Sequence, residues 1–103
     1  MENLSVGRIV QYVLSGADAE QINRRRVRGV GHAPDWPAGA QAHVGNPVIA
    51  GDIVPAIVVW PHHNEDSTFN GQAFLDGNDV LWLTSVRYDA GGGHGTWHWP
   101  ERV

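Results

Sequence analysis

The sequence contains no cysteine and no lysine, and none of its apolar runs is long enough to span a membrane. The lack of cysteine excludes disulfide bonds, thiolate zinc sites and a cysteine nucleophile, and it leaves the redox compartment undetermined. A membrane-spanning helix needs about 20 consecutive apolar residues. The first ten residues, MENLSVGRIV, lack a basic segment followed by an apolar one. We therefore expect no membrane segment, no secretory signal and a location in the cytoplasm.

All seven cationic side chains are arginines, and eleven acidic residues give the chain a formal net charge of -4. This balance disfavours duplex nucleic acid as a partner, because proteins that bind duplexes usually present a basic surface. A small anionic ligand remains compatible, since a local arginine cluster acts within a screening length of about 8–10 Å. The chain has 103 residues, which predicts a single domain over residues 1–103. Five tryptophans exceed what so small a core usually holds, which favours a homo-oligomer.

Segments rich in β-branched and aromatic residues alternate with turn signals, which predicts a mainly β domain. The main strands are expected near Arg8–Leu14, Ile53–Trp60, Gly71–Leu75 and Val80–Arg87, with a short strand in TWHWPE. Ser15 and Asp18 resemble a capping box, which predicts a short surface helix over about Ala17–Arg26. Pro55 is expected at a sheet edge or a bulge. The order of elements predicts a small, SH3-like, partly open β-barrel with one short N-terminal helix.

The motif INRRRVR concentrates four of the seven cations in one place: Arg24, Arg25, Arg26 and Arg28. One interpretation is a helix end, where cations interact with the macrodipole by about 0.3–1 kcal/mol. Adjacent guanidiniums repel one another, so a counter-anion is also expected. It comes either from Asp18, Glu20 or Asp35, or from a bound phosphate held by bidentate hydrogen bonds. The sequence leaves both alternatives open.

The segment HGTWHW near the end of the chain combines aromatic and imidazole side chains. In an extended conformation, Trp97 and Trp99 share one face, while His94, Thr96 and His98 share the other. The tryptophan face is either part of the core or a wall on which a base stacks, a contact that contributes about 1–3 kcal/mol per base. The histidines lack a third ligand at a defined spacing, so no metal and no cofactor is expected.

Two further groups of polar residues lie where a ligand could reach them. The turn GAQAHVGNP carries His43 and Asn46 and either presents backbone N–H groups to an anion or serves only as a turn. Thr84 and Ser85 follow Trp82 and add hydroxyl groups. No motif places a nucleophile on a strained turn, which favours a non-catalytic protein. The candidate ligand-binding residues are Arg24, Arg25, Arg26, Arg28, His43, Asn46, Trp82, Thr84, Ser85, Trp97, His98 and Trp99.

About half of the chain lies in four segments: DAEQINRRR, WPAGAQAHVGNPVIAGD, NGQAFLDGNDVLWLTS and GTWHWPERV. Together these segments resemble a family of small uncharacterised proteins encoded by tailed bacteriophages and prophages. The resemblance implies a phage product that acts in the bacterial host cytoplasm or in the virion. It also implies a non-catalytic role, and it carries over no assigned activity.

These features favour a phage accessory protein that binds and sequesters an anionic nucleotide, such as a cyclic-nucleotide immune signal of the host. The arginine cluster would hold phosphate, and Trp82, Trp97 or Trp99 would stack a base. His43, Asn46, Thr84 and Ser85 would contact base edges or ribose. The alternatives are a virion component, such as a head decoration or head–tail protein, and an inhibitor of a host protein.

Overall fold

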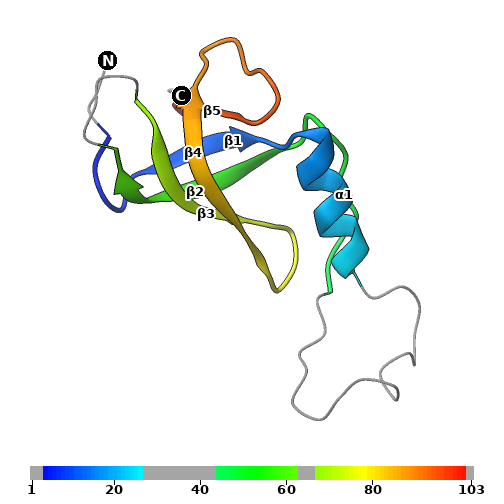
Figure 1. The fold of residues 1–103 in the computed structure, drawn as a ribbon. Coiled ribbons are helices and arrows are strands. Elements are labelled where there is room, and N and C mark those ends of the chain that lie inside the picture. Colours follow the sequence, from blue (N-terminus) through cyan, green and yellow to red (C-terminus); the bar gives the residue numbers. More distant parts are fainter. Residues whose placement is uncertain (1–3, 27–43, 63–66, 102–103) are drawn as a thin grey trace.

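The structure, a computed structural model, describes residues 4–26, 44–62 and 67–101. Its elements in chain order are β1 (Ile9–Val13), α1 (Gly16–Arg25), β2 (Ile53–Pro61), β3 (Phe69–Phe74), β4 (Val80–Tyr88) and β5 (Thr96–His98). The five strands form a closed barrel, and α1 lies beside it at one end (Figure 1). The predicted mainly β fold with one short helix is confirmed. The four main strands begin and end within two residues of their predicted bounds.

The barrel is closed, where the sequence predicted a partly open one. The last strand, β5, pairs antiparallel with β1, so that Gln11 lies opposite His98. It also pairs parallel with β4, so that Arg87 lies opposite Thr96. Trp97, in the middle of β5, is fully buried. This large side chain fills the core between the first and last strands of the barrel, and its burial favours closure of the sheet.

The helix α1 begins with the predicted capping box. The backbone N–H of Asp18 donates to the Ser15 hydroxyl, and the Asp18 carboxylate accepts from the Ser15 N–H at 2.9 Å. Ile22 is fully buried and anchors the helix to the barrel. Asn23 makes a double hydrogen bond to the backbone of Val48, donating at 2.8 Å and accepting at 2.9 Å. The helix is thereby fixed to the segment that leads into β2 (Figure 1).

The core of the barrel consists of the inward-facing side chains of all five strands. Trp97 lies at its centre, with ring-centroid distances of 4.9 Å to Tyr88, 5.9 Å to Phe69 and 5.0 Å to Trp99. Its indole N–H donates to the carbonyl oxygen of Ser67 at 2.8 Å, so its one polar atom is satisfied. The aromatic contacts are edge-to-face, an arrangement that adds stability beyond area burial alone.

Pro55 lies inside β2 and faces Gln11 of β1. The paired stretch between β2 and β3 begins one residue later, at Ala56. The proline thus lies at the end of that ladder rather than at a free edge of the sheet. Its missing N–H falls where the pairing with β3 has not yet begun, which makes a proline tolerable at this position.

Candidate functional site

The arginines at the end of α1 have a counter-anion within the chain, and it is one that the sequence analysis missed. Arg26 Nη1 donates to Asp79 Oδ1 at 2.6 Å, and the two side chains are only 4% and 2% exposed. Arg25 Nη2 lies 3.5 Å from Asp79 Oδ2. Two of the candidate phosphate-binding side chains are therefore engaged by a buried carboxylate. An acidic residue at the start of an apolar strand was the available signal, since a buried charge requires a partner.

The other proposed counter-anions are distributed differently. Glu20 lies 3.8 Å from Arg24 across one turn of the helix, and both side chains are exposed, so this pair contributes little. Asp18 caps the helix and accepts a hydrogen bond from the hydroxyl of Tyr12. Arg28, His43 and Asp35 lie outside the described residues.

Two glycines allow the backbone to approach the Arg26 guanidinium closely. A Cβ atom on Gly77 would lie 3.0 Å from Arg26 Nη1, and one on Gly45 would lie 3.1 Å from Arg26 Cζ. These glycines form an isolated bridge between the segment before β2 and the β3–β4 turn. Asn46 closes the same contact by donating to the Asp76 carboxylate at 2.6 Å. The side chain of Asn46 thus serves the packing of this turn.

Three candidate residues lie together on the outside of β4. Trp82 is 52% exposed and lies opposite Gln72 of β3. Thr84 and Ser85 are exposed as well. Ser85 has a positive φ of 52°, and its N–H donates to the Asn70 side chain at 2.7 Å, which stabilises an irregularity in the strand.

The two tryptophans of HGTWHW have different environments. Trp97 belongs to the core, as the first interpretation of this segment predicted. Trp99 follows the end of β5 and is half-buried, with its ring perpendicular to that of Trp97 at an interplanar angle of 89°. The guanidinium carbon of Arg8 lies 4.6 Å from the Trp99 ring centroid, which is cation–π geometry. Of these two indoles, Trp99 is the one that a ligand can reach.

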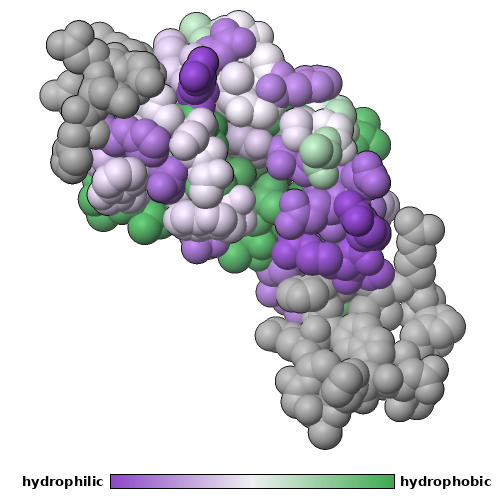
Figure 2. All heavy atoms as spheres, viewed as in Figure 1, coloured by the Kyte–Doolittle hydropathy of each residue, from purple (hydrophilic) through white to green (hydrophobic). Residues whose placement is uncertain are grey.

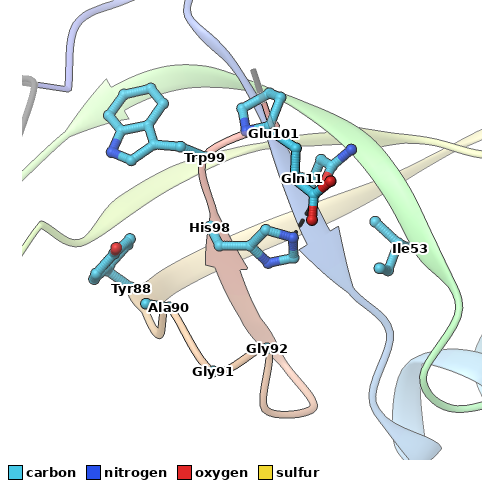
Figure 3. A pocket seen from close by; sticks show the side chains of 10 residues that line it. Gln11, Ile53, Tyr88, Ala90, Gly91, Gly92, His98, Trp99 and Glu101 are labelled. Atoms are coloured by element: carbon cyan, nitrogen blue, oxygen red, sulfur yellow. Dashed lines mark hydrogen bonds between the residues drawn. The ribbon is translucent and has the colours of Figure 1, made fainter. Parts of the chain in front are cut away.

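A pocket of about 690 Å³ is lined by Trp99 and His98 together with the middle of β1, the start of β2, the end of β4 and the glycine-rich turn after β4. Tyr88, Gln11 and Ile53 line it too. In Figure 3 the side chains of Tyr88 and Trp99 lie on one side of β5, and those of His98, Gln11 and Ile53 lie on the other. His98 Nε2 and Gln11 Oε1 are 3.0 Å apart and form a hydrogen bond (Figure 3). This volume lies within the range of about 300–1,000 Å³ that is typical of small-molecule sites.

The polar atoms of this pocket differ in whether they are already satisfied. His98 Nδ1 and Trp99 Nε1 are buried and have no hydrogen-bond partner among the described residues. In the turn after β4, by contrast, the Asp89 carboxylate accepts from Gly91 N at 2.9 Å and from Gly93 N at 3.1 Å. These two amides are therefore not available to an anion. The imidazole Nδ1 and the indole Nε1 are therefore unsatisfied but also shielded from the open part of the pocket.

Burial raises the pKa of Tyr12 well above its ordinary value, and the hydrogen bond to Asp18 raises it further. The described ranges contain no cluster of three or more His, Asp or Glu residues that could hold a metal ion. In those same ranges, no helix has the length and apolar character needed to cross a membrane.

Comparisons of the chain with protein-family models, with curated proteins and with solved structures find no match. The residues and their geometry therefore carry the functional inference.

Proposed function

We propose that this protein is a non-catalytic binding module whose pocket, lined by Trp99, His98, Tyr88 and Gln11, holds a nucleotide by its base. The observation that carries the proposal is a cavity whose lining includes two aromatic residues, Tyr88 and Trp99, and the hydrogen-bonded pair Gln11 and His98. Stacking on an aromatic ring supplies affinity without strong base preference. His98 holds the oxygen of the Gln11 amide, and the NH₂ group of that amide then donates a hydrogen bond to the edge of the base.

The charges near this pocket favour a different arginine from those proposed from the sequence. Arg25 and Arg26 are paired with Asp79 at the end of α1. Arg8 packs on Trp99, a residue that lines the pocket, and we assign its guanidinium to the phosphate in addition to the contacts that it already makes. Glu101, which also lines the pocket, carries the opposite charge and would disfavour ligands with many phosphates. We therefore expect nucleosides and nucleotides with one or two phosphate charges to bind best.

The biological setting follows from the resemblance to small phage proteins. A module without catalytic groups that takes up a nucleotide in the host cytoplasm would lower its free concentration, which is how sequestration opposes a nucleotide signal. A virion role or inhibition of a host protein would instead use the outer surface of the barrel. Ligand binding at the pocket distinguishes sequestration from these two alternatives.

The test is a titration of the ¹⁵N-labelled protein with nucleobases, nucleosides, nucleoside monophosphates and cyclic dinucleotides, read by NMR. We expect shifts at Gly91, Gly92, His98 and the Trp99 indole N–H. Gln11→Ala should weaken binding about 2- to 13-fold, the equivalent of a hydrogen bond contributing about 0.5–1.5 kcal/mol. Trp99→Leu should weaken it about 5- to 150-fold, as expected for the loss of a stacking contact.

Trp82→Leu is the matched control, because it removes an exposed indole that does not line the pocket. It should leave binding unchanged. Shifts confined to Arg24 and Arg25 would assign the ligand to the end of α1 and contradict the pocket. An absence of shifts with every compound of the panel would contradict nucleotide binding altogether.

A further inference from the structure

The outer surface of β2, β3 and β4 carries apolar side chains on three neighbouring strands. In the register of the sheet, Ile57 lies opposite Gln72, and Gln72 lies opposite Trp82. Two residues further along β2, β3 and β4 lie Pro55, Phe74 and Val80, of which Phe74 and Val80 are paired. We call the apolar residues of this surface the outer face: Pro55, Ile57, Phe74, Val80 and Trp82. All except Ile57, which is half-buried, are exposed. Contiguous apolar surface of this kind marks interaction sites in soluble proteins.

The outer face is also free of charge. The chain carries seven cationic and eleven acidic residues, yet Arg87 is the only charged residue within the described strands. Figure 2 shows much of the hydrophilic surface gathered where α1 lies, with hydrophobic patches among paler surface over the barrel. A partner for this face must therefore be as neutral and apolar as the face itself.

A second copy of this chain meets that requirement. In a two-fold contact the same surface lies on both sides, so any charge near the axis would face its own copy and repel it. The absence of charge removes this cost, and apolar surface is buried on both sides. The association that we consider uses side chains on this face, and it does not require the addition of a strand to the sheet.

We propose that two copies of this protein associate about a two-fold axis through the outer face, with Trp82 and Phe74 near the centre of the contact. Aromatic side chains that are exposed in the monomer and buried in the interface typically carry most of the binding energy. Trp82 is 52% exposed and Phe74 is 43% exposed, so both have surface to lose. Neither lines the pocket, and the dimer is therefore independent of the proposed ligand.

The experiment is sedimentation of the full chain over a range of micromolar concentrations. We expect the mass of a dimer for the wild type. Trp82→Glu should weaken the dimer at least about 30-fold, the equivalent of a hot-spot contribution of about 2 kcal/mol. Phe74→Gln should also weaken it, and this second variant keeps the test decisive if Trp82→Glu does not fold.

Ile49→Glu is the matched control, because it adds the same charge at a residue that is 70% exposed and lies before β2. It should remain dimeric. A monomeric wild type at every concentration would overturn the proposal and leave the face to a partner of another kind. A loss of the dimer in Ile49→Glu equal to that in Trp82→Glu would overturn it as well.

Discussion

The buried ion pair between Arg26 and Asp79 is the contact whose loss should destabilise the barrel most. Asp79→Asn keeps the shape of the side chain but removes its charge, and it leaves the Arg26 guanidinium buried without this counter-ion. Removing one partner of a buried ion pair typically costs about 3–5 kcal/mol. Arg26 Nε and Nη2 have no hydrogen-bond partner among the described residues. The pair is therefore imperfectly satisfied, and we expect about 3 kcal/mol.

This loss is a large part of the stability of a domain of this size, which is about 5–15 kcal/mol. With a shift of about 4–8 °C per kcal/mol, the melting temperature should fall by roughly 12–24 °C. The variant should still fold at room temperature if the wild type lies in the middle of that range. Urea unfolding followed by far-ultraviolet circular dichroism gives the free energy of unfolding of both proteins.

Arg24→Ala is the control for this measurement, because Arg24 belongs to an exposed pair at 3.8 Å. It should change the free energy of unfolding by no more than about 0.5 kcal/mol. Replacing Arg26 and Asp79 together by methionine removes both charges and should cost less than Asp79→Asn alone. The reasoning is refuted if Asp79→Asn is as mild as Arg24→Ala.

Two further predictions concern Tyr12 and the glycines near the ion pair. The raised pKa of Tyr12 means that the folded state holds its proton more tightly than the unfolded state. The free energy of unfolding should therefore fall as the pH rises above about 10. In urea titrations between about pH 8 and pH 11, it should fall less in Tyr12→Phe than in the wild type. An equal dependence of the free energy of unfolding on pH in the two proteins would contradict this. Gly77→Ala places a Cβ atom 2.5 Å from the Val44 carbonyl oxygen and should cost about 1–3 kcal/mol in urea unfolding. A Cβ atom at Gly16, at the start of α1, would meet nothing within 4 Å. Gly16→Ala should therefore be neutral or stabilising by up to about 1 kcal/mol. A similar loss of stability in Gly77→Ala and Gly16→Ala would be inconsistent with the packing.

The elements predicted well from the sequence are those set by local patterns. The capping residues Ser15 and Asp18 fixed the start of α1, and its predicted range of Ala17–Arg26 differs from the observed one by a single residue at each end. β-branched and aromatic runs between turn signals located the strands. Closure of the barrel was missed because β5 has only three residues, and so short a strand is held by its pairing and by the burial of Trp97 rather than by propensity.

The candidate site was less predictable, because its members meet only in three dimensions. Arg26 and Asp79 are 53 positions apart, so the sequence supplied the need for a counter-anion but not its identity. Alternation placed Trp97 and Trp99 on one face, but β5 ends at His98 and the two rings lie at right angles. The pocket adds Gln11 and Tyr88, which had been seen only as parts of strands.

The seam between β1 and β5 also has a consequence for how the chain folds. Gln11 and His98 are hydrogen-bonded although 87 positions separate them, whereas β2, β3 and β4 pair with their neighbours in sequence. A contact between residues so far apart in sequence costs chain entropy before it contributes any stability. We therefore expect the pairing of β1 with β5 to form last during folding and to open first during unfolding. Amide hydrogen exchange at Trp97 and His98 reports that opening. Since Gln11 and His98 both line the pocket, the pocket exists only once the chain has closed on itself, and a molecule bound there would slow the first step of unfolding.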